Sequence, residues 1–337
     1  MPKPVANPPN PFEEARLEWD GPPPPAELEI FEEETTEALA KNTSPDIDFT
    51  WSCNPYRGCF HACAYCYARP THQYLGFGAG TDFDRKIVVK TNVAERLRAT
   101  FDRRSWRGER VAFSGNTDCY QPLEASYALT RACLEVCRDY RNPVQIITKS
   151  KLVRRDADLL AELHDAADAR VTLSIPFVDD AMARAIEPYA SSPTKRFETV
   201  RLLHEAGVPV TVSLGPVIPG LNDDQIPDIL ERAAHAGAHA AFMILIRLPR
   251  EVLPVFTERV EEAFPLRAGK VLNTIRGVRE GAMNDARFGS RMRGRGPRWS
   301  AIEQLFEMHR RRVGLQPSEP VSPPPTFRRP TAQLALF

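Results

Sequence analysis

The sequence lacks both a net charge and a long apolar run. Its 44 basic side chains are matched by 44 acidic ones, which argues against binding of nucleic acid or membrane through bulk positive charge. The longest purely apolar run covers residues 240–246, far short of the roughly 20 residues that span a bilayer. Residues 1–9 lack the basic-then-apolar order of a secretory signal. These absences predict a cytoplasmic protein without a membrane partner.

Cysteine is sparse, and its number is odd. Seven cysteines in 337 residues are too few for a secreted disulfide scaffold, and one would be left unpaired. We therefore expect reduced thiols with metal or redox roles. Cys133 and Cys137 lie four residues apart, with Leu129 on the same helical face. This arrangement is typical of core residues rather than of ligands.

Proline is plentiful but concentrated at the two ends of the chain. Residues 1–26 hold nine prolines, and residues 316–337 hold six of the total of 31. Such stretches have few backbone donors and bury little surface, so both ends are expected to be extended and mobile. The sequence therefore predicts a disordered segment over residues 1–26, one domain over residues 27–315 and a proline-rich tail over residues 316–337.

The predicted domain alternates buried strands with helices. Its strands are short β-branched runs, and the helical pattern between them is clearest over residues 194–207. There, Thr194 is the expected cap, and Phe197, Val200 and Leu203 lie on one face. The predicted strands cover residues 47–52, 110–115, 144–150, 170–177, 208–217 and 239–248.

Six strand-helix units favour parallel pairing, which fits an open doubly wound sheet or a partial barrel. Periodicity does not distinguish these two architectures. In both of them the ligand site lies beyond the carboxyl ends of the strands, so functional residues are expected directly after each strand. After residue 266 the pattern changes, and a last amphipathic helix is expected over residues 299–313.

The strongest local signal is the run Cys59-Phe-His-Ala-Cys63-Ala-Tyr-Cys66. Cysteine is the soft ligand that iron-sulfur clusters and zinc prefer, and three thiolates in one loop can converge on one centre. Three ligands leave one iron of a cubane cluster open, whereas a structural zinc site is closed by four. Cys53 or His61 could supply the fourth ligand, so a plain zinc site is the alternative.

This spacing, with Tyr65 before the last cysteine, resembles the radical S-adenosylmethionine superfamily. In that superfamily the cysteines that match Cys59, Cys63 and Cys66 bind a [4Fe-4S] cluster, and S-adenosylmethionine chelates its fourth iron. The likeness covers about residues 40–300 and implies a partial (β/α)6 barrel. Further runs are similar to the spore photoproduct lyase-like branch, namely Asn54-Pro-Tyr-Arg-Gly-Cys59, Tyr67-Ala-Arg-Pro70, His72-Gln-Tyr-Leu-Gly76, Gly115-Asn-Thr-Asp118 and Tyr120-Gln-Pro-Leu-Glu124.

The resemblance also implies which residues bind S-adenosylmethionine. An aromatic side chain would pack on its adenine, a carboxylate would hold its amino group, and a lysine would pair with its carboxylate. A serine would bind its ribose, and a glycine would let the backbone approach the adenine. The same carboxylate, lysine and glycine could instead serve as a surface cap, a solvated side chain and a turn. The predicted cofactor-binding residues are Tyr65, Asn116, Asp118, Lys149, Ser174 and Gly220.

The reaction that the resemblance implies is cleavage of S-adenosylmethionine to a 5′-deoxyadenosyl radical, which takes a hydrogen atom from the substrate. Tyr67 and Cys119 are the candidate catalytic residues. In spore photoproduct lyase a hydrogen-donating cysteine precedes the segment that matches residues 116–118, but Gly115 stands at that place here. The same lyase reaction is therefore in doubt, and Cys119 is the nearby alternative donor. A flavodoxin or ferredoxin is the expected electron donor.

Two further segments point to partners. Residues 287–298 contain five arginines spaced by glycines and no acid, which suits either phosphate contacts or a loop of structural ion pairs. The chain finishes with Gln333-Leu-Ala-Leu-Phe337, which resembles the peptide that docks bacterial polymerases and repair factors on the DNA sliding clamp. The alternative is an end that folds back onto its own domain. The five arginines are Arg287, Arg291, Arg293, Arg295 and Arg298.

We therefore expect a radical S-adenosylmethionine enzyme that acts on a nucleic acid in DNA repair or modification, possible lyase chemistry included. Within this enzyme class, a tRNA or protein substrate is an alternative, because no residue pattern reads a base or a peptide. The alternative from another class is a non-catalytic iron-sulfur or zinc module that acts through its tails.

Overall fold

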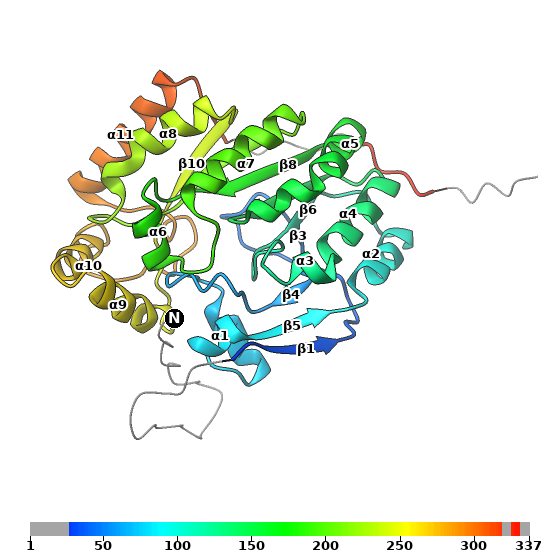
Figure 1. The fold of residues 1–337 in the computed structure, drawn as a ribbon, viewed down its shortest axis with the longest axis horizontal. Coiled ribbons are helices and arrows are strands. Elements are labelled where there is room, and N and C mark those ends of the chain that lie inside the picture. The colour runs from blue at the N-terminus through cyan, green and yellow to red at the C-terminus, as the bar shows by residue number, and fades with distance from the viewer. Residues whose placement is uncertain (1–26, 319–324, 331–337) are drawn as a thin grey trace, which may run out of the picture.

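The structure, a computed structural model, describes residues 27–318 and 325–330. The predicted disordered segment over residues 1–26 and the terminal Gln333-Leu-Ala-Leu-Phe337 lie outside the described residues. Within them the chain forms a curved eight-stranded sheet with helices packed on its outer side, and a smaller three-stranded sheet lies beside it (Figure 1). No helix in this part of the chain is long and apolar enough to cross a membrane.

The eight-stranded sheet has the order β11-β10-β9-β8-β7-β6-β3-β2. Only β2 pairs antiparallel to its neighbour, and the other neighbours are parallel. The strands from β3 to β10 form the predicted partial barrel of six parallel strands. Its strands, together with the edge strands β2 and β11, are β2 (Leu39–Lys41), β3 (Trp51–Cys53), β6 (Val111–Phe113), β7 (Val144–Thr148), β8 (Ala169–Ser174), β9 (Val210–Val217), β10 (Ala240–Leu245) and β11 (Gln316–Pro317).

Each predicted strand is present, although the strand expected over residues 47–52 is shorter and begins at Trp51. The helices follow the strands as crossovers or cover the carboxyl-terminal part of the chain. The α-helices are α1 (Thr81–Arg85), α2 (Val93–Asp102), α3 (Glu124–Tyr127), α4 (Leu129–Asp139), α5 (Ala157–Ala167), α6 (Asp180–Ile186), α7 (Pro193–Glu205), α8 (Ile226–His235), α9 (Val252–Ala263), α10 (Ala268–Gly277) and α11 (Gly296–Arg312). The 3-10 helices are η1 (Arg69–Leu75), η2 (Lys151–Asp156) and η3 (Asp223–Gln225).

Helix α7 confirms the expected buried face but corrects its cap. Phe197, Val200 and Leu203 are all buried. The N-cap is Ser192, whose side chain accepts a hydrogen bond from the Lys195 amide. A proline at the first helical position and a serine before it make a common helix start. The expected cap, Thr194, lies inside the helix and instead donates its hydroxyl and its amide to Asp180.

The three-stranded sheet was not predicted, and it positions the loop that carries the cysteines. Its order is β1-β5-β4, with β1 parallel and β4 antiparallel to β5. Strand β4 leads directly into the cysteines, and the amide of Cys59 donates to the Phe83 carbonyl in α1. The strands are β1 (Glu29–Glu33), β4 (Tyr56–Arg57) and β5 (Lys86–Lys90).

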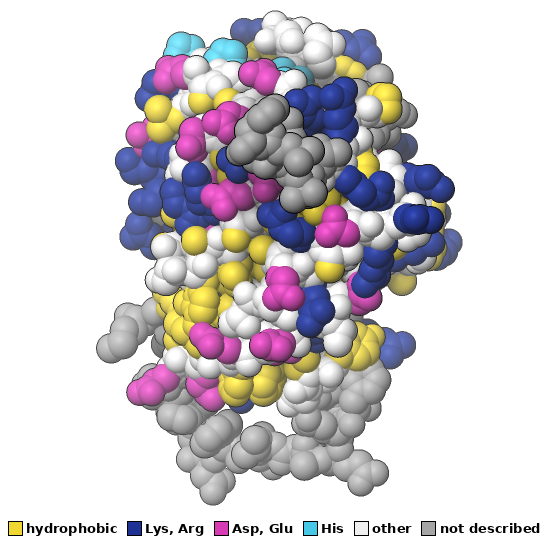
Figure 2. Space-filling model, turned by 90° about the vertical axis from the view of Figure 1, so that its right-hand side faces the viewer, with side chains coloured by type: hydrophobic (Ala, Val, Ile, Leu, Met, Phe, Trp, Pro, Cys, Tyr) yellow, Lys and Arg dark blue, Asp and Glu magenta, His cyan; other side chains and the backbone are white. Residues whose placement is uncertain are grey.

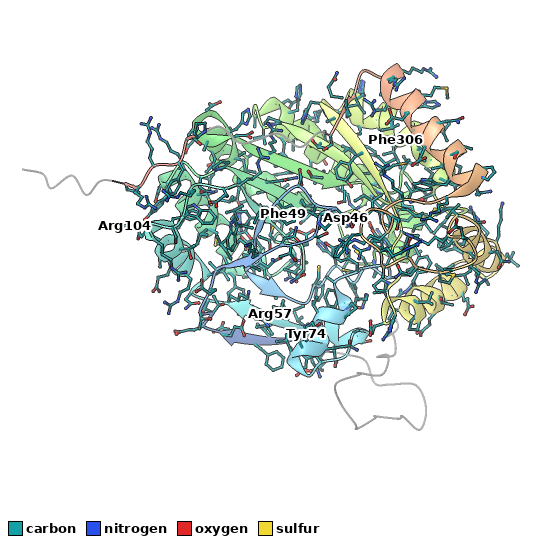
Figure 3. All side chains as sticks on the ribbon, turned by 180° about the vertical axis from the view of Figure 1, so that it is seen from behind. Asp46, Phe49, Arg57, Tyr74, Arg104 and Phe306 are labelled. Atoms are coloured by element: carbon teal, nitrogen blue, oxygen red, sulfur yellow. The ribbon has the colours of Figure 1, made fainter. Side chains whose placement is uncertain are left out.

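Side chains join the segment before β3 to the segment after α10. The Arg291 guanidinium lies 2.5 Å from the Asp46 carboxylate and donates to the Ser44 hydroxyl. The amide of Gly289 also donates to Asp46. In Figure 3, Asp46 lies near the middle of the molecule, where the segment before β3 meets the segment after α10. These contacts narrow the opening of the barrel.

The described part of the tail, residues 325–330, packs onto the domain rather than extending from it. Phe327 lies against Phe101 and Tyr140, with ring centroids 6.0 and 6.1 Å away. Arg329 donates to three backbone carbonyls near the end of α2. These contacts lie at the amino ends of β6 and β7, on the face shown in Figure 2, where basic and acidic side chains are interspersed. Aromatic packing and carbonyl contacts hold these six residues against the domain, and the extended, mobile tail expected from composition stays a prediction.

Candidate active site

The cysteine loop, residues 59–66, lies beyond the carboxyl ends of β3 and β6 and is tied to α1, to α6 and to the segment before α3. Besides the contact of Cys59 with α1, the Phe60 amide donates to Gln121 at 3.0 Å, and the Ala64 amide donates to the last residue of α6. Burial, and then the neighbouring Cys59 thiol, raises the pKa of Cys66 to about 11. Burial also raises the pKa of Cys63, with Cys66 and Cys59 contributing. The three thiols thus come from one loop, in which Cys59 and Cys63 are buried and Cys66 is partly buried.

Arg69 holds the far side of the cysteine loop. Its side chain is fully buried, and it donates twice to the Cys63 carbonyl, at 3.2 and 3.0 Å. It also donates to the carbonyls of Ala79 and Gly80 and forms an ion pair with Asp84 at 2.9 Å. A guanidinium has five donors in a rigid plane, so one side chain can fix several backbone segments at once. In the sequence Arg69 is recognisable only as part of the run Tyr67-Ala-Arg-Pro70, and its role in holding the loop was not predicted.

The runs that resemble the lyase branch build a scaffold around the cysteine loop. Gln121 accepts from the loop and donates to the Gly58 carbonyl, and Thr117 donates to the same carbonyl at 2.5 Å. Glu124 is fully buried and accepts from the Tyr56 hydroxyl at 2.5 Å and from Arg155. Such satisfied buried networks fix one arrangement of the chain. These motif residues therefore hold the cysteine loop and the residue before it in one orientation.

Replacement of Gly58 by alanine is expected to lower cluster content. Gly58 has φ of +75°, and an added Cβ would lie 3.0 Å from each of three neighbouring atoms, in His72, Ile87 and Lys86. Left-handed backbone costs an alanine about 1–2 kcal/mol, and the crowding would move the neighbouring Cys59. Gly207→Ala is the matched control, since φ is +82° with open space around it. Urea unfolding should show destabilisation in both variants, larger in Gly58→Ala because of the crowding, and iron measurements should show iron loss only in Gly58→Ala; equal iron contents would contradict this role.

His61 and Asp118 form a buried pair beside the cysteines. The His61 Nδ1 lies 3.4 Å from the Asp118 carboxylate. Burial alone would lower the pKa of His61, but Asp118 and then Cys59 raise it to about 10. Burial would raise the pKa of Asp118, but His61 and hydrogen bonds lower it to about 2. Asp118 also accepts from the Thr148 hydroxyl and the Lys149 amide. Asp118 was predicted to hold the amino group of S-adenosylmethionine. In this structure both of its carboxylate oxygens already have protein partners.

The alternative of a plain zinc site loses one of its candidate fourth ligands. Cys53 forms its side-chain contact with Cys133 of α4, within the main core. Cys133 and Cys137 are fully buried there, in agreement with the core role expected for them. His61 pairs with Asp118 through Nδ1, an arrangement that leaves Nε2 available to a metal. The three thiols of the loop fit a [4Fe-4S] cluster with one open iron.

Tyr65 and Lys149 lie together on one side of the cysteine loop. The Lys149 ammonium lies 5.7 Å from the centroid of the Tyr65 ring. The Tyr65 hydroxyl donates to Glu187, and Glu187 forms an ion pair with Arg196; all three side chains are buried. Sequence reasoning missed Glu187 and Arg196, because nothing in the sequence pairs two charges with a tyrosine 122 residues away. The cofactor roles of Tyr65 and Lys149 stay predictions.

The other predicted cofactor residues lie at the expected strand ends. Ser174 ends β8, is buried, and accepts from Arg196 through its carbonyl. Asn116 is exposed, and its amide donates to Asn54. Gly220 has φ of +87°, and an added Cβ would lie 3.2 Å from Thr274 in α10. The close approach that the structure shows at Gly220 is therefore to a helix. These assignments also stay predictions.

The two candidate catalytic residues differ in their accessibility. Cys119 is fully buried in the main core, and its amide donates to the Ser114 hydroxyl. Its thiol does not reach the surface of the site in this structure. Tyr67 is 49% exposed, and its hydroxyl donates to the Gly115 carbonyl at 2.7 Å. The Arg247 guanidinium, just after β10, lies 5.4 Å from the centroid of the same ring. Tyr67 thus presents an aromatic ring at the barrel mouth, the space beyond the carboxyl ends of the strands.

The arginine-rich segment is largely engaged in ion pairs. Arg287 pairs with Asp285, Arg291 with Asp46, Arg295 with Glu280 and Arg298 with Asp223. Arg295 and Arg298 also line a cavity of about 410 Å³ between α10 and the start of α11. These contacts agree with the alternative that the segment is a loop of structural ion pairs. Phosphate binding by the segment stays a prediction.

Comparisons with known proteins agree with this fold and donor set. A family profile described as the Radical SAM superfamily matches residues 53–233, more than half of the chain. The chain therefore belongs to the radical S-adenosylmethionine superfamily, whose members are enzymes that use a [4Fe-4S] cluster and S-adenosylmethionine. The cluster ligands would be Cys59, Cys63 and Cys66, which the matched region contains.

Among solved structures, the fold is similar to that of spore photoproduct lyase bound to AdoMet and a dinucleoside spore photoproduct. The TM-score is 0.61 at 16% identity, over 86% of this chain and 81% of the lyase. An uncharacterized protein of Mycobacterium tuberculosis is 41% identical over 194 residues, 57% of either chain. The radical SAM Nalpha-GlyT isomerase of Pseudomonas phage M6 is 24% identical over 62% of this chain and 42% of its own length. The match thus spans little more than half of the mycobacterial relative.

Proposed function

We propose that this radical S-adenosylmethionine enzyme acts on DNA, in repair or modification. The observation that carries the proposal is the exposed ring of Tyr67, next to the last cluster cysteine. Enzymes that act on a base within a duplex take it out of the stack and hold it against aromatic side chains, because every base has a face that stacks. When bound, the cluster and S-adenosylmethionine supply a 5′-deoxyadenosyl radical that removes a hydrogen atom. Tyr67 would hold the base within reach of that chemistry.

The comparisons support a substrate of this kind. Spore photoproduct lyase, whose fold is similar, has been solved with a dinucleoside spore photoproduct. The present chain has Gly115 before residues 116–118, and Cys119 is buried. Because the hydrogen-donating cysteine of the lyase has no accessible counterpart here, the proposal is a reaction on DNA and does not extend to the lyase reaction itself.

The experiment is an anaerobic assay of the reconstituted full-length protein with dithionite and S-adenosylmethionine. Damaged DNA, undamaged DNA, tRNA and protein extract, each labelled with deuterium, are supplied separately. We expect only the DNA samples to stimulate 5′-deoxyadenosine formation, and deuterium from the DNA to appear in that product. Stimulation and label transfer by tRNA or protein, with none from DNA, would reject the DNA proposal while leaving the enzyme class unchanged.

We also propose that the terminal pentapeptide, residues 333–337, binds the DNA sliding clamp. Its sequence supports this, and so does the position of the preceding residues. Pro330 follows an anchor in which Arg329 and Phe327 contact the amino-end face of the barrel. The cysteine loop lies beyond the carboxyl ends of the same strands. A partner held after Pro330 would therefore leave the barrel mouth accessible.

Deletion of residues 333–337 is expected to reduce clamp binding at least tenfold and to leave cluster content and 5′-deoxyadenosine formation unchanged. The physical reason is that three apolar side chains in a partner pocket contribute several kcal/mol, about 1.5–3 kcal/mol each when fully buried. Surface plasmon resonance with immobilised clamp measures the affinity. The matched control replaces Thr331 and Ala332 with glycines and keeps the pentapeptide. Equal clamp affinity of the deleted and full-length chains would contradict the partner proposal.

A further inference from the structure

Arg247 is a cation at the barrel mouth that no acid in the described part of the chain neutralises. It follows β10, and its guanidinium lies over the ring of Tyr67. Its Nε is buried and has no hydrogen-bond partner. No carboxylate among the described residues forms an ion pair with it, although Asp46 is near enough to influence its charge. The side chain is partly buried, so its charge is not fully solvated.

Two neighbouring arginines, Arg291 and Arg279, donate hydrogen bonds to protein groups, although the Nε of Arg279, like that of Arg247, has no partner that the structure describes. Arg291 binds Asp46 and Ser44. Arg279 donates to the carbonyls of Ile246 and Arg291. Burial, and then the neighbouring Arg291, lowers the pKa of Arg247. The environment therefore disfavours the charge on Arg247 when the site contains protein alone.

An unpaired and partly desolvated charge is unfavourable, and an anionic ligand would relieve it. A guanidinium matches the geometry of a phosphate or a carboxylate, because it can donate two parallel hydrogen bonds. The adjacent Tyr67 ring adds an aromatic surface that favours a base over a simple organic acid. An aromatic ring and a free guanidinium within 5.4 Å together suit a nucleotide.

We propose that Arg247 binds a phosphate of the DNA strand, next to the nucleotide whose base stacks on Tyr67. This inference rests on the proposed function and adds a residue that fixes the position of the substrate. Arg247 contacts the substrate backbone rather than the reacting atoms. The Tyr67 hydroxyl, held by the Gly115 carbonyl, keeps the ring at a fixed place relative to the cysteine loop. Phosphate binding would then set which nucleotide reaches the radical chemistry.

The test is fluorescence anisotropy with a short labelled single-stranded DNA and the anaerobically reconstituted full-length protein in the presence of S-adenosylmethionine. We expect Arg247→Gln to weaken binding about tenfold. The slope of the logarithm of affinity against the logarithm of salt concentration should become shallower by about one, the value for one phosphate contact. Arg247→Lys keeps the charge but loses the planar pair of donors, so it should bind with intermediate affinity. Arg201→Gln is the matched control, because Arg201 is exposed on α7 and pairs with Glu205. It should change the affinity by less than about twofold.

Two further readouts separate this inference from other roles of Arg247. The midpoint of thermal unfolding should change little in Arg247→Gln, because the side chain has no ion pair to lose and only its contact with the Tyr67 ring is removed. The affinity for S-adenosylmethionine should also be unchanged. DNA affinity equal to that of Arg201→Gln would overturn the inference, and so would a selective loss of S-adenosylmethionine binding, which would assign Arg247 to the cofactor carboxylate. If the wild-type protein bound no DNA, the proposed function would fail, and this inference with it.

Discussion

Cys63→Ala is expected to lose its iron and sulfide and to form no 5′-deoxyadenosine above background. The loop supplies three thiols, and Cys53, which contacts Cys133 in the main core, lies outside that loop. Two thiolates cannot hold a cubane cluster in which three irons need protein ligands. Iron and sulfide assays, the visible absorption of the cluster and quantification of 5′-deoxyadenosine measure the effect after identical anaerobic reconstitution.

Cys133→Ala provides the matched control for this loss. It removes the same thiol group from a cysteine that is fully buried in α4 and faces the core. We expect it to cost on the order of 1 kcal/mol of stability, because a small cavity replaces the sulfur. Its cluster content and 5′-deoxyadenosine formation should match the wild type. Full cluster content in Cys63→Ala, or equal cluster loss in both variants, would contradict the assignment of the ligands.

Glu187→Leu is expected to lower the free energy of unfolding by about 3–5 kcal/mol. Glu187 and Arg196 are fully buried, and Glu187 also accepts from the Tyr65 hydroxyl. Removing the carboxylate leaves the Arg196 charge uncompensated in a region of low polarity, where an unpaired charge is costly. Because Tyr65 belongs to the cysteine loop, cluster content should fall as well. Urea unfolding of the reconstituted protein measures the stability.

A double variant, Glu187→Leu with Arg196→Met, tests the reason for that loss. Replacing both partners of a buried ion pair by apolar side chains of similar size is often close to neutral. We therefore expect the double variant to recover at least half of the stability that the single variant loses. The Tyr65 hydroxyl would still lack a partner, which accounts for part of the remaining deficit. A double variant less stable than Glu187→Leu would show that the charge is not the cause.

The central strands could be predicted because their sequences are locally distinctive. β7, β8 and β9 contain β-branched residues, β10 is an unbroken apolar run, and helical patterns separate them, so these local signals are sufficient. β1 has the sequence EIFEE and is largely exposed. Its pairing with β5 joins segments more than 50 residues apart. Such a strand depends on its tertiary partner rather than on its own composition.

The three cysteines could be predicted from their spacing, whereas their supports could not. Arg69, Gln121 and Glu187 each act through partners that sequence order does not reveal. Asp118 shows the same limit, because a carboxylate after a strand suggests a ligand site, yet His61 takes it as an ion-pair partner. The arginine-rich segment likewise finds its acids far along the chain, as Arg291 does with Asp46. Local patterns indicate donor types, and only the fold decides which donors remain free.

The barrel has no strand pairing between the two edges of its sheet. β2 and β11 are the edge strands, and in the part of the chain that the structure describes they do not pair with each other. The segment before β3 and the segment after α10 are instead joined by side chains such as Asp46 and Arg291. Separating these two segments would break side-chain contacts but no ladder of backbone hydrogen bonds. A wider opening at this place would therefore cost the barrel none of its strand pairs.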